Sequence, residues 1–276
     1  MAERITPERS AEERSRVAVL SRRDRVLIWS CLAVITLLAW AYLIHLDRQM
    51  ASAMAYDRMM AEMGMGMAMS MPWTPADVFF TFVMWAVMMV GMMAGTATPV
   101  LMLFAGMHAG RGGRRVPLIV LIFGAGYLIV WIGFSACAAL AQWGLHQAAM
   151  LSPAMAASSP LLSGAILVAA GVYQLTPFKG ACLTRCRSPL GFLMSHWRDG
   201  ASGALLMGVR HGAACLGCCW ALMCVLFVVG VMNLVWVAAL TGFVLIEKIG
   251  PAGVGIARIA GAAMVVVGVL LAAGVV

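Results

Sequence analysis

The sequence predicts an all-α protein, a polytopic transmembrane bundle of about seven spanning helices with a cytoplasmic N-terminus. Of the 276 residues, 63% are hydrophobic and only 11% are charged, and the mean hydropathy is +0.95. A soluble domain carries about a quarter charged residues. A chain this apolar must satisfy its backbone hydrogen bonds within helices or a closed barrel, and its continuous apolar runs exclude the alternating strands of a barrel.

A spanning helix needs about 20 mainly apolar residues. Seven stretches approach that length, and they are Val26–Ile44, Asp77–Met107, Val116–Gln142, Leu161–Pro177, Ala204–Val231, Met232–Ile246 and Val254–Val276. The fourth stretch is short, and only a thin turn, Val231-Met232-Asn233, separates the fifth stretch from the sixth.

The basic residues predict the orientation, because Lys and Arg collect in the cytoplasmic flanks of spanning helices. They precede the first stretch, follow the second, and lie between the fourth and fifth and between the sixth and seventh. By contrast, Leu145–Pro160 holds none and Asp47–Pro75 holds only Arg48 and Arg58. The sequence therefore predicts a multi-pass protein of the bacterial inner (cytoplasmic) membrane, with the C-terminus outside. No small-residue cleavage site follows the basic arm, so no cleavable signal peptide is expected.

We expect two parts in the chain, a basic cytoplasmic arm at 1–25 and one transmembrane domain at 26–276. The domain carries an external Met-rich loop at 47–76 and a cytoplasmic amphipathic segment at 179–203. The net charge of +8 indicates attraction to anionic membrane lipid and no nucleic-acid partner, because aromatic residues do not interleave with the arginines.

Methionines form the first unusual pattern. Nine lie in Met50–Met71, and from Met63 to Met71 they occupy every second position in a Gly-rich strip that we expect to be flexible. Thioether sulfur forms no disulfide and suits Cu(I) outside the cytoplasm. A disordered low-complexity loop without a role is the alternative.

The second apolar stretch continues this pattern after a helix-start sequence, Thr74-Pro75-Ala76-Asp77. Met84, Met88 and Met92 wind along one side of a helix, flanked by Met89 and Met93. These sulfurs could relay a metal, although methionine also packs well in any apolar interior. Thr96, Thr98 and Pro99 are expected to loosen this helix.

Cysteine and histidine form the second pattern. With His211 at zero on a helical wheel, Cys215 lies at about 40°, Cys218 at about −20° and Cys219 at about 80°, so all four share one face. Spacings of three and four residues allow side chains to converge on one ion. Close packing of small residues at a helix interface is the alternative. Cys182 and Cys186 lie one turn apart in a segment that ends the fourth stretch, and His196 in the segment Pro189–Asp199 is a further possible ligand.

These residues resemble a bacterial family, the domain-of-unknown-function family 2182, described as predicted metal-binding integral membrane proteins. The resemblance covers roughly residues 73 to 250 and includes Trp85 and the Met-rich second helix. It is carried by Tyr173-Gln174-Leu175-Thr176-Pro177, Cys182, Cys186, Arg187, Pro189-Leu190, His196-Trp197-Arg198-Asp199-Gly200, Met207-Gly208, His211-Gly212, Cys215-Leu216-Gly217-Cys218-Cys219-Trp220, Gly230-Val231-Met232-Asn233 and Glu247-Lys248. The resemblance implies membrane topology and metal binding, without a substrate or a ligand set.

The function that the sequence favours is copper(I) handling by uptake, relay or delivery, with zinc or haem as other cofactors. Metal ligands are expected among His211, Cys215, Cys218, Cys219, Cys182, Cys186, His196, Met84, Met88 and Met92. A metal chaperone or a metalloenzyme acceptor and a homo- or hetero-oligomer are the expected partners besides the metal ion and lipid. The alternatives are a redox enzyme or haem- or quinone-linked partner, using His45, His108, His146 and His211, and a structural subunit that packs through Gly106-x3-Gly110 and Gly208-x3-Gly212. An enzyme is not indicated, because paired carboxylates and nucleophile motifs are absent from the sequence, and Glu247-Lys248 is interpreted simply as the end of the sixth helix.

Overall fold

A computed structural model describes residues 20–63, 73–112, 115–152 and 155–275. Within these ranges the protein is helical and forms no strand beyond an isolated bridge between Leu151 and Ala157. The helices are α2 (Arg22–Glu62), α3 (Pro75–Gly110), α4 (Val116–Gln147), α5 (Pro160–Leu175), α6 (Pro177–Arg187), α7 (Pro189–His196), α8 (Gly200–Cys224), α9 (Leu226–Val229), α10 (Leu234–Ile249) and α11 (Gly253–Ala272).

Five of these helical segments are long and apolar enough to cross a membrane. They are α2, α3, α4, α8 continued by α9, and α11. The pair α5 and α6 passes the same test jointly but is bent by 64°, which makes it a broken span or a re-entrant loop. The structure thus confirms the all-helical class and supports a multi-pass membrane protein. The count of seven and the cytoplasmic N-terminus stay predictions.

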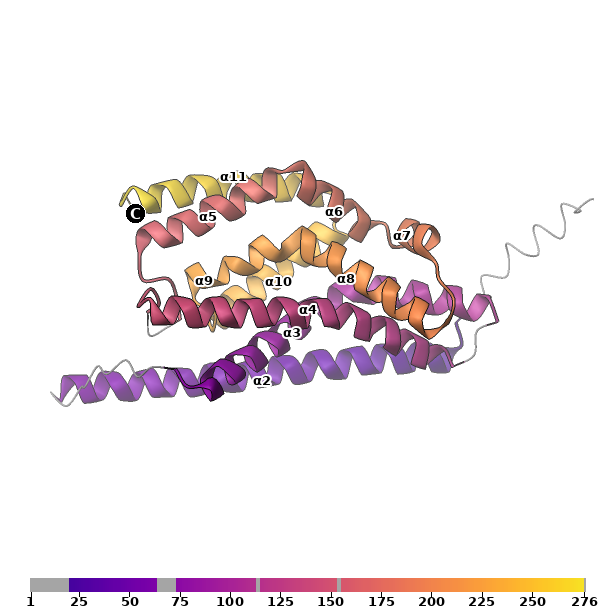
Figure 1. Ribbon diagram of the computed structural model, residues 1–276, viewed down its shortest axis with the longest axis horizontal. Coiled ribbons are helices and arrows are strands. Elements are labelled where there is room, and N and C mark those ends of the chain that lie inside the picture. The colour runs from indigo at the N-terminus through magenta and orange to yellow at the C-terminus, as the bar shows by residue number, and fades with distance from the viewer. Residues whose placement is uncertain (1–19, 64–72, 113–114, 153–154, 276) are drawn as a thin grey trace, which may run out of the picture.

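The helices run roughly along a common direction (Figure 1). α2 lies along one side of the bundle, α5 and α11 lie together along the other, and α8 and α10 lie between them. The most extensive contacts between helices are those of α5 with α11, α4 with α8, α3 with α4, and α2 with α3. α8 is the most buried span, so the cysteine-bearing helix is the central one.

Glycines allow α4 and α8 to approach closely. A side chain at Gly208 of α8 would clash with the carbonyl oxygen of Phe123 on α4, and one at Gly126 would clash with that of Leu205. A Cβ atom at Gly212 would lie 3.0 Å from the carbonyl oxygen of Tyr127. The surface formed by Gly208-x3-Gly212 therefore packs against α4 of the same chain. By contrast, no heavy atom lies within 4 Å of the Cβ position of Gly106.

The loop expected at 47–76 is helical over its first part, because α2 continues to Glu62. The continuation has a local cause: alanine, methionine, arginine and glutamate make up most of residues 47–62 and favour helix, and no glycine occurs before Gly64. An external Met-rich loop at 47–76 stays a prediction. The alternating methionines from Met65 to Met71 lie outside the described residues.

The ends of the helices follow local chemistry. Thr74 and Asp77 form the expected capping box at the start of α3, and α3 continues through Pro99 without interruption. Pro177 disfavours helical conformation at Thr176, whose hydroxyl then accepts from the amide of Lys179 and caps α6. Gly230, with a φ of 95°, and Asn233, which caps α10, make the thin turn expected after α8 and α9.

Candidate metal centre

The three cysteines of α8 lie in the protein core. Cys215, Cys218 and Cys219 are each 1% exposed, and His211 is 4% exposed. The inward face expected from their helical spacing is therefore buried against other helices. None of these thiols is turned towards the outer surface of the bundle.

A fourth thiol comes from a different element. Cys186 near the end of α6 places its sulfur 3.9 Å from the sulfur of Cys218 on α8. α6 and α8 approach closely at Gly217, where a Cβ atom would lie 2.9 Å from the sulfur of Cys182. The Tyr173 hydroxyl of α5 donates to the carbonyl oxygen of the same glycine. The break at Thr176-Pro177 turns α6 towards α8 and so brings Cys182 and Cys186 to this face. We refer to Cys186, Cys215, Cys218 and Cys219 as the thiol cluster.

Two polar side chains that were not expected at this site contact the thiol cluster. The Lys248 ammonium group donates to the Cys215 sulfur at 2.9 Å, and the Tyr127 hydroxyl lies 3.0 Å from the same sulfur. Lys248 is 8% exposed and reaches inward from the end of α10. The helix end at Glu247-Lys248 was located correctly, but its burial was missed. The position of Lys248 at the end of a long apolar run could have indicated a role at the site, because an ionisable group within or near a membrane span is usually functional.

The thiols of Cys218 and Cys219 are turned back onto their own helix. Both donate to the carbonyl oxygen of Cys215, at 3.0 Å and 2.9 Å. Over the part of the chain that the structure describes, no group of three or more His, Cys, Asp or Glu side chains is arranged to hold a metal ion. Loading a metal here therefore requires these thiols to rotate away from the carbonyl and Lys248 to release the sulfur of Cys215. The residue set nevertheless fits a soft cation, because three buried thiols lie together beside the half-buried Cys186 and thiolates are soft ligands.

His211 contributes a buried imidazole beside the thiols. Its Nδ1 atom is buried and has no hydrogen-bond partner, and its ring lies against Phe123, Tyr127 and Phe192. His196, at the end of α7, is more exposed, and its Nδ1 atom is 2.8 Å from the hydroxyl of Ser195. The Nδ1 atom of His211 is therefore unpaired, whereas the Nδ1 atom of His196 is paired with the Ser195 hydroxyl.

The methionines of α3 face the core. Met88, Met89 and Met92 are fully buried, Met93 is 1% exposed and Met84 is 7% exposed. Met93 is linked to the thiol cluster through Thr96: the Thr96 hydroxyl lies 3.9 Å from the Met93 sulfur and 3.4 Å from the Lys248 ammonium group. Met207, Met223 and Met232 are buried in the same core. From its spacing, Met93 was expected only on the flank of the methionine stripe.

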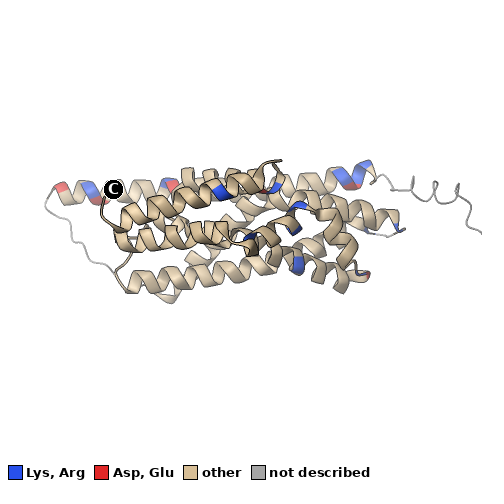
Figure 2. Cartoon of the chain, turned by 90° about the horizontal axis from the view of Figure 1, so that it is seen from above, with Lys and Arg blue, Asp and Glu red and all other residues tan. Residues whose placement is uncertain are grey.

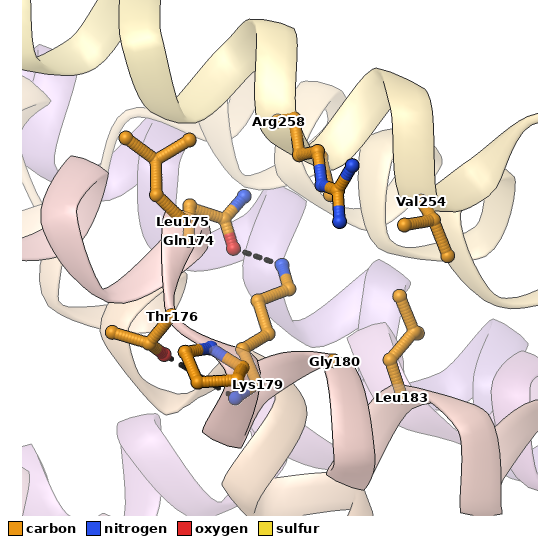
Figure 3. Close-up of a pocket in the computed structure, with 10 residues that line it drawn as sticks. Gln174, Leu175, Thr176, Lys179, Gly180, Leu183, Val254 and Arg258 are labelled. Carbon is orange, nitrogen blue, oxygen red and sulfur yellow. Dashed lines mark hydrogen bonds between the residues drawn. The ribbon is translucent and has the colours of Figure 1, made fainter.

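A second polar cluster lies beside the break between α5 and α6. The Lys179 ammonium group donates to both carboxylate oxygens of Glu247, at 2.8 and 2.9 Å. It also donates to the side-chain oxygen of Gln174, as Figure 3 shows. Arg258 of α11 and Lys179 line a cavity of about 160 Å³ there. This cluster joins α5, α6 and α10 and contains none of the cysteines.

The comparison with protein families decides the broader assignment, because residues 82–271 match the PpoB2 family of copper chaperones. The chain belongs to this family. The match contains the buried α3 methionines from Met84, the thiol cluster, His211 and Lys248, and it leaves the Met-rich segment Met50–Met71 outside. No curated protein and no solved structure matches the chain. Membership of the PpoB2 family supports a copper-handling role, and the resemblance to family 2182 stays a prediction.

Proposed function

We propose that this protein handles copper(I) across the bacterial inner membrane, and that the thiol cluster with His211 and Cys182 is its internal binding site. The observation that carries the proposal is the meeting of Cys186 from α6 with Cys218 from α8, at 3.9 Å between sulfurs. Thiolate ligands from two helices bind Cu(I) in preference to harder cations, and the family of the chain is one of copper chaperones.

The methionines supply the route in this proposal. Met50–Met71 collects Cu(I) outside, and Met84, Met88, Met92 and Met93 pass it along α3 towards Thr96 and Lys248. Ligand softness rises from thioether to thiolate in that direction, which favours inward delivery to a metal chaperone or metalloenzyme acceptor. A gradient or the acceptor supplies the driving force. His196, whose Nδ1 atom is 2.8 Å from the Ser195 hydroxyl, would bind a metal through Nε2.

The first prediction tests the site. Replacing Cys215 and Cys218 by serine in one variant is expected to abolish copper co-purification, because a hydroxyl does not replace a thiolate as a ligand for Cu(I). Elemental analysis of anaerobically purified protein measures it. The matched control carries Cys31→Ser and Cys137→Ser, which change two exposed thiols on α2 and α4. A wild-type copper content in the Cys215 and Cys218 variant would refute the site.

A further inference from the structure

A small cavity opens beside the thiol cluster. It has a volume of about 200 Å³, and its polar lining comes from Cys186, His211, Lys248, Arg187 and Thr96. Pro99, Val100, Pro189 and Ile249 form the apolar part of its wall. The cavity therefore joins one thiol of the cluster and the imidazole of His211 to the outside of the bundle, at the place where α3, α6, α8 and α10 meet.

The lining carries positive charge without a compensating carboxylate. Lys248 and Arg187 both contribute cations, and no Asp or Glu lies among the lining residues that the structure describes. The nearest carboxylate in sequence, Glu247, is held by Lys179 and Gln174 on the other side of the helix end. Further Lys and Arg residues lie in the same half of the molecule, which holds α6, α7 and the start of α2 (Figure 2).

This charge distribution selects among forms of copper. A cavity lined by one sign of charge changes the local concentration and the association rate of charged ligands by about 10- to 1,000-fold. Free Cu(I) is a cation and is repelled. A Cu(I) ion bound by thiolates that carry carboxylates is an anion and is attracted. The volume is below the roughly 300–1,000 Å³ of common ligand pockets, so the occupant has few heavy atoms.

We propose that this cavity is a docking site for small anionic thiols that carry Cu(I), and that Cys186 is the thiol with which they exchange the metal. The inference rests on the proposed copper function for its biological meaning. In delivery, a bond from copper to a carrier thiolate forms as the bond from copper to the Cys186 sulfur breaks. The proton of the carrier thiol passes to the Cys186 sulfur, and no electron is transferred. The same exchange in reverse loads the apoprotein. His211, with its unpartnered Nδ1 atom, is the second donor that faces the exchanging metal.

The charge of the cavity can be tested without copper. Methanethiosulfonate reagents carrying either a sulfonate or a trimethylammonium group modify Cys186, and peptide mass spectrometry follows the rate of each. Relative to a free thiol in solution, we expect the sulfonate to be favoured at Cys186 by about tenfold or more. In Lys248→Met, a neutral side chain of similar length, this preference falls several-fold. An equal or a cation-favouring ratio in the wild-type protein would overturn the inference, whatever happens to copper.

Metal transfer supplies the second arm. Cu(I) is offered to the apoprotein as complexes of 3-mercaptopropionate, 2-mercaptoethanol or cysteamine, which are similar in size and differ in charge. Timed desalting and elemental analysis should show transfer fastest from the 3-mercaptopropionate complex, which carries the most negative charge, and slowest from the cationic cysteamine complex. Anion preference in the reagent arm without any copper uptake would refute the copper function and leave the charge selectivity of the cavity standing. Copper uptake at the same rate from all three complexes would refute the carrier inference alone.

Discussion

Lys179 and Glu247 are each 1% exposed and form an ion pair between α6 and α10. Gln174 of α5 donates to the same carboxylate at 3.0 Å, so three elements meet at one buried charge. Lys248, the next residue, is turned to the thiol cluster and meets the Cys215 sulfur. Two adjacent residues of α10 thus serve different clusters. Each buried charge has a partner, as is required in a medium of low polarity.

Lys179→Met is expected to lower the free energy of unfolding by about 3–5 kcal/mol, because it leaves the Glu247 carboxylate buried and unpaired. Thermal unfolding in detergent measures the change. Adding Glu247→Leu to the same chain should recover much of the loss, since the unpaired charge is then removed. Arg185→Gln, at an exposed position on the same helix, is the control and should unfold near the wild-type temperature. Wild-type stability of Lys179→Met would contradict the role given to this pair.

At the scale of elements, α11 is held against α5 by backbone contact between glycines. A Cβ atom at Gly171 would lie 2.6 Å from the carbonyl oxygen of Gly261 and 2.8 Å from the amide nitrogen of Val265. A Cβ atom at Gly268 would lie 2.8 Å from the carbonyl oxygen of Gly164. Because backbone atoms cannot rotate away as a side chain does, this helix pair depends on the absence of side chains at these positions.

Gly171→Ala should loosen α11 and cost about 1–3 kcal/mol, the usual range for overpacking. Limited proteolysis near Gly250–Gly253, together with the unfolding temperature, measures the effect. Gly133→Ala on α4 is the matched control, since no heavy atom lies within 4 Å of its Cβ position. An alanine in an exposed helix interior is favoured over glycine by about 0.5–1 kcal/mol. If the two variants unfold at the same temperature, the close contact between α5 and α11 is refuted.

At the scale of the whole molecule, charge is unevenly distributed along the bundle. Most Lys and Arg residues lie in the half that holds the start of α2, α6 and α7, whereas the other half holds few (Figure 2). Short basic flanks stay in the cytoplasm. The half that contains the α5 and α6 break and the cavity beside Cys186 is accordingly proposed to be the cytoplasmic half.

Reporter fusions test this orientation. Alkaline phosphatase, which is active only outside the cytoplasm, should be inactive when fused after Gly112 and active when fused after Ala148 or Val276. Green fluorescent protein at the same positions should give the opposite pattern. Phosphatase activity at Gly112 would contradict the orientation. Equal behaviour at Gly112 and Val276 would contradict an odd number of crossings from the N-terminus to the C-terminus.

Much of the helical plan was predictable because each of its causes is local. The capping box at Thr74 and Asp77, the break at Thr176-Pro177 and the turn at Gly230–Asn233 depend on residues next to one another. The helical continuation of α2 to Glu62 was missed, although its composition favours helix. The broken span was predicted only as a short stretch, because apolarity does not report a bend of 64°.

The candidate site was also predictable only in part. Helical periodicity alone placed His211, Cys215, Cys218 and Cys219 on one face, since that depends only on spacing within α8. The meeting of Cys186 with Cys218, the contact of Lys248 and Tyr127 with the Cys215 sulfur, and the cavity beside them needed the tertiary structure. Those contacts join residues 32 to 88 positions apart. Local spacing reports which residues share a face of one helix, but it does not report which helices become neighbours.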